Sequence, residues 1–221
     1  MKRAVIIVAG GKGLRMGGDV PKQFMLIDGR PILMHTIEQF HRYDATLEIV
    51  VVLPADQAGY WEELCSQYCF DIAHAVAQGG PERFFSVRNG LEAVDSDAEL
   101  IAIHDGVRPY VSREVIGRCY EEAMRSGAAI PVVEVYETMR QLTPEGSQTV
   151  PRSNYRLVQT PQTFRSEIIR QAYRQDFNPQ FTDDASVVEE LGYRIALVEG
   201  NRENIKITTP SDIQYAEFLC K

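Results

Sequence analysis

The chain has 221 residues, of which 44% are hydrophobic and 24% are charged. This is an ordinary globular composition, so we expect a single domain over residues 1–221 without long disorder. Acidic residues number 31 against 23 basic ones, and the formal net charge is −8. Such a charge disfavours an extended polyanion, so no nucleic-acid partner is expected.

Hydropathy gives no sign of export or of membrane insertion. The apolar run at 4–9 is too short for a secretory signal, and no later run is long enough to span a bilayer. The four cysteines are too few for a disulfide framework, and no histidine cluster joins them in a metal site. We therefore expect a cytoplasmic protein with no membrane partner and no protein-built metal site.

Short apolar, β-branched runs alternate with helical patterns along the chain. The runs predict buried strands at 4–8, 49–53, 100–103, 128–133 and 195–198. Apolar residues at helical spacing predict helices at 32–40, 58–68, 84–93, 113–126, 167–175 and 185–191. This alternation predicts an α/β fold with a doubly wound, mostly parallel, Rossmann-like sheet that has helices on both faces.

Several helix ends are marked by local chemistry. Ser112 is a suitable N-cap, and Gly127 can adopt the left-handed conformation that stops the helix between them. Thr209 followed by Pro210 and Asp212 predicts a last helix running to the C-terminus.

The segment 134–161 breaks the alternation because it is rich in Thr, Gln, Arg and Pro. Turn residues at 144–146 lie between two extended-looking flanks, which predicts a β-hairpin arm projecting from the sheet. An isolated hairpin is marginally stable, so we expect it to pack on a second copy of the chain in a homodimer.

A glycine-rich segment follows the first predicted strand directly. It runs from Ala9 to Lys22 and combines backbone that can approach an anion closely with three cations, Lys12, Arg15 and Lys22. The spacing matches neither a Walker loop nor the dinucleotide fingerprint. We interpret the segment as a phosphate-binding loop, and a flexible glycine turn with solvated cations is the alternative.

Three further polar clusters are predicted at the same edge of the sheet, where ligands of such folds gather. The clusters lie at 79–86, 104–109 and 204–210. Each has a structural alternative: the glycines of the first could simply make a turn, and Asp105 with Arg108 could be an ion pair that only stabilises the fold.

Together these segments resemble a known family. The resemblance rests on the ordered set Ala9-Gly10-Gly11 through Arg15, Pro21-Lys22-Gln23, Gly79-Gly80 with Arg83 and Ser86, His104-Asp105 with Arg108-Pro109, Glu137-Thr138-Met139, Thr160-Pro161-Gln162 and Asn204-Ile205-Lys206-Ile207-Thr208. This set covers nearly the whole chain and is similar to 2-C-methyl-D-erythritol 4-phosphate cytidylyltransferases of the non-mevalonate isoprenoid pathway.

The resemblance implies a nucleotidyltransferase fold and the reaction of CTP with the sugar-alcohol phosphate, with Mg²⁺ carried mainly by the CTP phosphates. It implies catalytic roles for Arg15, Lys22, Arg152 and Lys206. Nucleotide contacts are implied for Ala9, Gly10, Gly11, Gly13, Gly80, Ser86 and Asp105. Acceptor contacts are implied for Asp105, Arg108, Thr138, Arg152, Lys206 and Thr208. Members are homodimers whose arm reaches the partner's site, so Thr138 and Arg152 are expected to act in the neighbouring subunit.

The chain departs from the family pattern at Pro81, where members often carry a polar residue, and at Phe84-Phe85, which replaces a polar pair. Side-chain contacts to the nucleotide are therefore unsettled there. Within the same chemistry, a ribitol-5-phosphate cytidylyltransferase or a sugar-1-phosphate nucleotidyltransferase stays an alternative. From other classes, a nicotinamide-dependent oxidoreductase and a catalytically idle binding protein are the alternatives.

Overall fold

The computed structural model of the chain describes residues 1–10 and 20–220. Its centre is an eight-stranded sheet in which six strands share one direction and two oppose it. The six are β1 (Arg3–Val8), β4 (Glu48–Leu53), β5 (Ala75–Gln78), β6 (Leu100–Asp105), β7 (Ala128–Glu134) and β12 (Ala196–Glu199). The opposing strands are β10 (Arg156–Val158) and β11 (Gln162–Arg165). The predicted mostly parallel sheet is confirmed.

Strand β1 lies in the interior of the sheet and pairs in parallel with β4 and β6. On the far side of β6, strand β11 separates β6 from β7 and runs antiparallel to both. The carboxyl ends of β1, β4, β5 and β6 therefore meet at one edge, which is where the predicted polar clusters begin.

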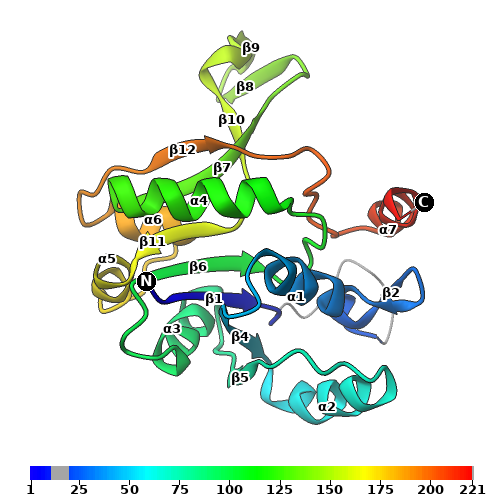
Figure 1. Cartoon of the computed structure of the whole chain (residues 1–221). Helices are drawn as coiled ribbons and strands as arrows, with labels where there is room; N and C mark the ends of the chain where they lie inside the picture. The colour runs from blue at the N-terminus through cyan, green and yellow to red at the C-terminus, as the bar shows by residue number, and fades with distance from the viewer. Residues whose placement is uncertain (11–19, 221) are drawn as a thin grey trace.

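Helices cover both faces of the sheet (Figure 1). One core contains residues of α1 (Ile32–Tyr43), α2 (Ala58–Gln67) and α4 (Arg113–Ser126). The other contains residues of α3 (Arg83–Ala93), α5 (Ser166–Ala172) and α6 (Asp184–Glu189). Strand β1 shows why two cores form: Val5 and Ile7 enter the first and Ala4 and Ile6 the second, because successive side chains of a strand point to opposite faces.

The predicted helix ends are confirmed. The Ser112 hydroxyl accepts a hydrogen bond from the backbone N–H of Val115 at 3.2 Å, and Gly127 has a φ of 96° at the end of α4. Thr209 and Asp212 form a capping box at the start of α7 (Pro210–Leu219). None of the helices in residues 1–10 and 20–220 is long and apolar enough to cross a membrane.

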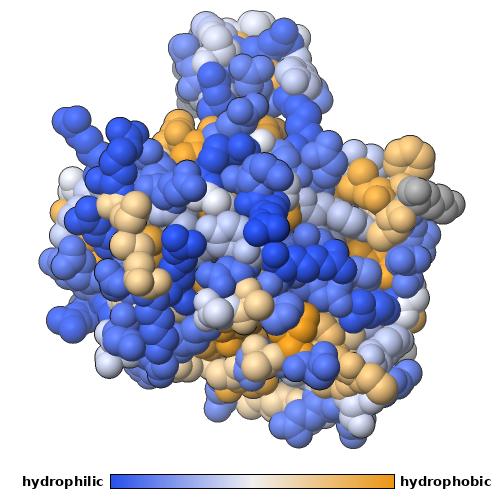
Figure 2. All heavy atoms as spheres, viewed as in Figure 1, coloured by the Kyte–Doolittle hydropathy of each residue, from blue (hydrophilic) through white to orange (hydrophobic). Residues whose placement is uncertain are grey.

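Strands β8 (Met139–Thr143) and β9 (Gly146–Val150) form a separate two-stranded hairpin that stands away from the sheet (Figures 1 and 2). The projecting hairpin is confirmed, but it is shorter than the predicted segment 134–161. Residues 156–158 return to the main sheet as β10 and pair with β7. The remaining short elements are β2 (Leu26–Ile27), β3 (Arg30–Pro31), η2 (Lys22–Phe24), η3 (Ala55–Gln57) and η4 (Arg152–Asn154).

Candidate active site

A cleft of about 740 Å³ opens where β1, β4, β5 and β6 end. Seven residues predicted for the site line it, namely Ala9, Gly10, Lys22, Gly80, Ser86, Asp105 and Lys206. They come from four separate segments of the chain, which the fold brings together at this one cleft. Gly11, Gly13 and Arg15 lie outside the residues that the structure describes.

The backbone after β1 is held close to its neighbours. The Ala9 N–H donates to the carbonyl of Val52, and the Gly106 N–H donates to the carbonyl of Val8, at 2.9 and 2.8 Å. A Cβ on Gly106 would lie 2.8 Å from the Cβ of Ala9, so any larger residue would push the floor of the cleft apart. Lys22 begins η2 and is half-buried at the cleft.

The turn between β5 and α3 forms a second wall. Its Gly80 N–H donates to the Ser86 hydroxyl at 3.0 Å, and that hydroxyl donates to the carbonyl of Glu82 at 3.2 Å. A Cβ on Gly80 would lie 2.3 Å from the Cβ of Phe85. The turn therefore requires glycine and is pinned from inside by Ser86.

Asp105 is the last residue of β6, and its carboxylate forms ion pairs with two basic side chains. Its Oδ2 atom lies 3.0 Å from Lys206 Nζ and 3.0 Å from Arg108 Nε. Burial opposes the charge of the Asp105 carboxyl, but neighbouring cations, chiefly Lys206 and Arg83, outweigh it and hold its pKa well below the ordinary value. The Asp105–Arg108 ion pair that the sequence allowed is present, and Asp105 lines the cleft as well.

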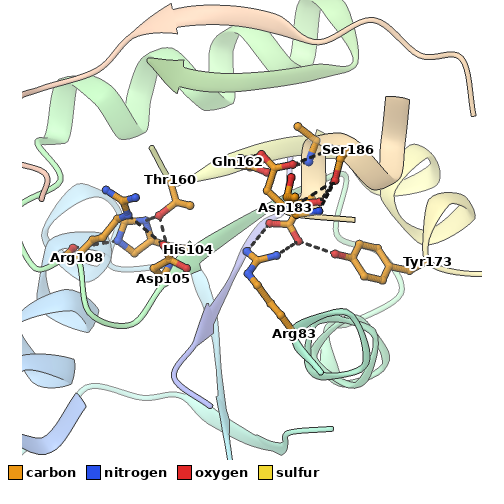
Figure 3. A network of polar contacts seen from close by, with 12 residues as sticks. Arg83, His104, Asp105, Arg108, Thr160, Gln162, Tyr173, Asp183 and Ser186 are labelled. Atoms are coloured by element: carbon orange, nitrogen blue, oxygen red, sulfur yellow. Dashed lines mark hydrogen bonds and ion pairs between the residues drawn. The ribbon is translucent and has the colours of Figure 1, made fainter. Parts of the chain in front are cut away.

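His104 is fully buried behind this cluster (Figure 3). Its Nε2 atom lies 3.0 Å from the carbonyl of Arg108, and its Nδ1 lies 3.0 Å from the hydroxyl of Thr160. Burial lowers the pKa of His104 to about 4, so the ring is neutral at neutral pH. A carbonyl only accepts, so Nε2 carries the proton and Nδ1 accepts from Thr160. The Thr160 hydroxyl in turn accepts the N–H of Asp105 at 3.1 Å, which fixes the end of β6.

The other predicted residues do not line this cleft in their own chain. Arg108 is largely buried and donates to Asp105 and, at 2.8 Å, to the carbonyl of Asn204. The Thr208 hydroxyl donates to Asp212 in the cap of α7. Thr138 and Arg152 are exposed at the base of the hairpin, where Arg152 donates to the carbonyl of Tyr136.

Comparison with known proteins identifies the family of this chain. The family model of 2-C-methyl-D-erythritol 4-phosphate cytidylyltransferase matches residues 3–221. The chain belongs to this family. A cytidylyltransferase from Bacteroides thetaiotaomicron bearing that name is 58% identical over 219 residues, which cover 99% of this chain and 100% of the relative. One from Phocaeicola vulgatus is 56% identical over the same length, with the same coverage.

Solved structures agree with the family. The 2-C-methyl-D-erythritol 4-phosphate cytidylyltransferase of Thermus thermophilus superposes with a TM-score of 0.81 at 36% identity, over 99% of this chain and 98% of that one. The 4-diphosphocytidyl-2C-methyl-D-erythritol synthase of Anaerococcus prevotii gives 0.85 at 28% identity, over 100% and 96%. The chain is thus a cytidylyltransferase for 2-C-methyl-D-erythritol 4-phosphate, and the oxidoreductase and idle-protein alternatives are set aside.

Sequence reasoning missed part of the cytidylyltransferase cleft. Arg83 lines it, and the guanidinium donates to both carboxylate oxygens of Asp184 at 2.8 and 2.6 Å. Gln23 is buried at the cleft and donates to Gln57 of η3 at 2.6 Å. Arg83 belongs to the segment 79–86 that the sequence analysis singled out, but it was not predicted as a site residue. The signal for Gln57 is its position shortly after the carboxyl end of β4.

No group of three or more His, Cys, Asp or Glu side chains suited to a metal ion occurs among the described residues. Asp105 is nevertheless a carboxylate that lines the cleft. Mg²⁺ in such sites is typically held by substrate phosphates with one or two carboxylates, so the residues present fit that mode of binding.

Proposed function

We propose that this cleft is where the cytidylyl group passes from CTP to 2-C-methyl-D-erythritol 4-phosphate, giving 4-diphosphocytidyl-2-C-methyl-D-erythritol and pyrophosphate. The observation that carries the proposal is the meeting of Lys22, Lys206 and two glycine-bearing turns in one cleft of about 740 Å³. That volume is within the range of small-molecule sites. The product is an intermediate of the non-mevalonate route to isoprenoids, as the family resemblance implies.

The chemistry needs positioned charge rather than a general base. An oxygen of the acceptor phosphate attacks the α-phosphorus of CTP, and the bond from that phosphorus to the oxygen bridging the β-phosphorus breaks. Pyrophosphate leaves with the bonding electron pair. The acceptor phosphate has a second pKa of about 6 and is already largely dianionic at neutral pH. The neutral, internally bonded His104 is consistent with this, because its ring nitrogens are engaged in holding the fold.

We assign the two ends of the cleft to different parts of CTP. Gly80 and Ser86 line the end that we give to cytosine and ribose, while Ala9, Gly10, Gly11 and Gly13 would approach the phosphates. Lys22 and Arg15 would stabilise charge at the α-phosphate as it develops in the transition state. Arg15 and the two later glycines lie outside the described residues.

The acceptor is assigned to the side of the cleft at Asp105. Lys206 would bind its phosphate, and the Asp105 carboxylate that holds Lys206 would also face the sugar-alcohol hydroxyls. Arg108 and Thr208 support this wall from behind through Asp105 and the α7 cap. Mg²⁺ would be held by the CTP phosphates and Asp105, and when bound it supplies neutralising charge on the triphosphate.

Thr138 and Arg152 would act in the cleft of a second copy. The base of the hairpin exposes apolar surface that supports such pairing: Tyr136 is 58% exposed, Leu157 52% and Val158 42%. Exposed apolar patches of this kind are typical of protein interfaces. We propose a homodimer joined through this region, working in the cytoplasm.

The direct test is release of pyrophosphate from CTP and Mg²⁺ in the presence of each candidate acceptor. We expect turnover with 2-C-methyl-D-erythritol 4-phosphate and little with ribitol 5-phosphate. Turnover with ribitol 5-phosphate at equal or higher kcat/KM would reject the acceptor assignment. Omitting Mg²⁺ in the presence of a chelator should abolish release, and full activity without it would reject the role given to the metal.

A further inference from the structure

Arg83 connects the cleft to a buried carboxylate on another helix. It is the first residue of α3 and lines the cleft, while its guanidinium reaches Asp184, the first residue of α6, 101 positions later in the chain. The two bonds form a bidentate pair, with Nη1 to Oδ1 at 2.8 Å and Nη2 to Oδ2 at 2.6 Å. In Figure 3 the Arg83 side chain extends away from its helix, and the hydroxyl of Tyr173 is directed toward the same region.

Asp184 is completely buried and forms an ion pair with the Arg83 guanidinium. Besides the guanidinium, the hydroxyl of Tyr173 donates to Oδ1 at 2.6 Å. The Tyr173 ring stacks on Phe84 at 4.8 Å between centroids, and Phe84 stacks on Phe181 at 5.8 Å. Such a pair is costly to break because removing one partner leaves the other charge buried without compensation.

The network is attached to the turn that we assign to the base of CTP. Within the turn, Ser86 bonds Gly80 and Glu82, but these contacts only link the turn to itself. Pro81 and Glu82 are exposed and carry no side-chain bond to another element among the described residues. The backbone N–H of Gly79 donates to the carbonyl of Leu53 at 2.7 Å and ties the first residue of the turn to β4. The Arg83–Asp184 pair ties the other end of the turn to α6, across the core that α3 and α6 share.

We propose that Asp184 is a positioning residue for the nucleotide: acting through Arg83, and supported by Tyr173, it fixes the wall at 79–86 against which cytosine lies. The inference rests on the proposed placement of the base. Cytosine and uracil differ in the amino or keto group at position 4 and in the proton on N3, so rejecting UTP requires hydrogen-bonding groups held at fixed positions. Nothing in the reaction requires Asp184 to contact the nucleotide itself.

The test measures KM and kcat with CTP and UTP for Asp184→Asn and Tyr173→Phe. Asp184→Asn removes the charge but keeps the shape, and we expect KM for CTP to rise about tenfold with kcat changed less, since a hydrogen bond to a charged group is lost. The ratio of kcat/KM for CTP over UTP should fall in the same variant. Tyr173→Phe keeps the stacked ring, so a smaller rise of about threefold is expected.

Tyr120→Phe is the matched control. Tyr120 is also fully buried, and its hydroxyl donates to the carbonyl of Ala4 at 2.8 Å, on the face opposite to α3. Tyr120→Phe should lower the melting temperature, as Tyr173→Phe does, but it should leave KM for CTP unchanged. A purely structural role for Asp184 predicts that Tyr173→Phe behaves like this control, which would overturn the proposal even if Asp184→Asn fails to fold.

Ser86→Ala separates this inference from the proposed function. If it leaves KM for CTP unchanged, the base does not lie at 79–86, and both the placement and the inference fall. If Ser86→Ala raises KM while the Asp184 and Tyr173 variants match the wild type, the placement stands and the role of Asp184 is wrong. Raised KM and weakened CTP preference in all three variants would support both.

Discussion

Lys22 lies at the point where the glycine-rich segment ends and the described wall of the cleft begins. Removing one donor that stabilises transition-state charge typically costs on the order of 10²- to 10³-fold in rate. We expect Lys22→Ala to lower kcat by about that factor at saturating CTP, as steady-state pyrophosphate release would measure. Arg15→Ala should behave in the same way.

Lys2→Ala is the control for Lys22→Ala. Lys2 is a lysine of the same chain whose ammonium pairs with Asp95 and Asp97, away from the cleft. It should keep wild-type kcat. Near-wild-type turnover of Lys22→Ala with CTP saturating would show that the α-phosphate charge is stabilised elsewhere.

His104 makes a second prediction at this scale, through pH. Its pKa is lowered from 6.5 to about 4 by burial, so the unfolded chain binds more protons than the folded one between those values. Stability therefore rises with pH across this window, and it is lost as pH falls from about 6.5 to 4, by up to about 3 kcal/mol. Urea unfolding measured at a series of pH values should show this slope.

The variant His104→Gln removes the titrating ring. Its unfolding free energy should depend less on pH between 4 and 6.5 than that of the wild type, whatever its absolute stability. Because both proteins retain Asp105 and the other carboxyls, their contributions cancel in the difference. Equal slopes in the two proteins would mean that His104 is not the group responsible.

At the scale of single residues, the sequence predicts the position of a residue well where it comes at or just after the end of a predicted strand. Asp105 and Ala9 are of this kind, because topology alone brings the ends of parallel strands together. The partners of these residues are less predictable. Asp184 directly precedes the helix predicted at 185–191, and nothing local indicates that its carboxylate meets Arg83, which the fold brings from 101 positions away.

At the scale of elements, the strands that sequence analysis missed are too short or too polar to give the apolar run on which it depends. Strand β11 is central and its first three residues are buried, yet only Phe164 among its residues is apolar. Gln162 is tolerated inside because its amide donates to Asp183 at 2.7 Å and accepts the N–H of Ala185 at 2.9 Å. Strand β5 is mostly exposed at the sheet edge. The arm was predicted too long because β10 has only three residues, Arg156–Val158, and so short a strand gives no periodic signal of its own.

Helix α7 follows the segment of Lys206, which we assign to the acceptor, and the cap of α7 offers a test at this scale. One oxygen of Asp212 accepts from the backbone N–H groups of Thr208 and Thr209, both at 2.8 Å. Losing such a cap typically costs about 1 kcal/mol. Asp212→Ala should therefore lower the melting temperature by a few degrees, and it should raise KM for the acceptor because Lys206 lies just before the cap.

Ser112→Ala provides the comparison, since it removes the N-cap of α4 instead. A similar loss of stability is expected from it, with KM for the acceptor unchanged. If both variants change KM equally, general destabilisation rather than the position of Lys206 is the cause.

At the scale of the whole molecule, the cleft and the hairpin are parts of one chain that lie apart. Lys22 and Lys206 line the cleft, whereas Arg152 is exposed beside the hairpin, outside that lining. The family resemblance predicts that Arg152 completes the cleft of a partner. The fold could be predicted from the pattern of strands and helices, but a contribution from a second copy leaves no trace in the periodicity of one chain.

Mixing two inactive variants tests this arrangement. Consider a heterodimer of one Lys22→Ala subunit and one Arg152→Ala subunit. If each arm acts on the cleft of the partner, one cleft carries both substitutions and the other cleft carries neither. Random exchange of subunits makes half of the dimers mixed, so activity should recover to about a quarter of the wild type. If Arg152 instead serves the cleft of its own chain, each cleft keeps one defect, and no activity returns on mixing. The recovery, measured as pyrophosphate release after unfolding and refolding the variants together, therefore distinguishes the two arrangements without any structure of the dimer.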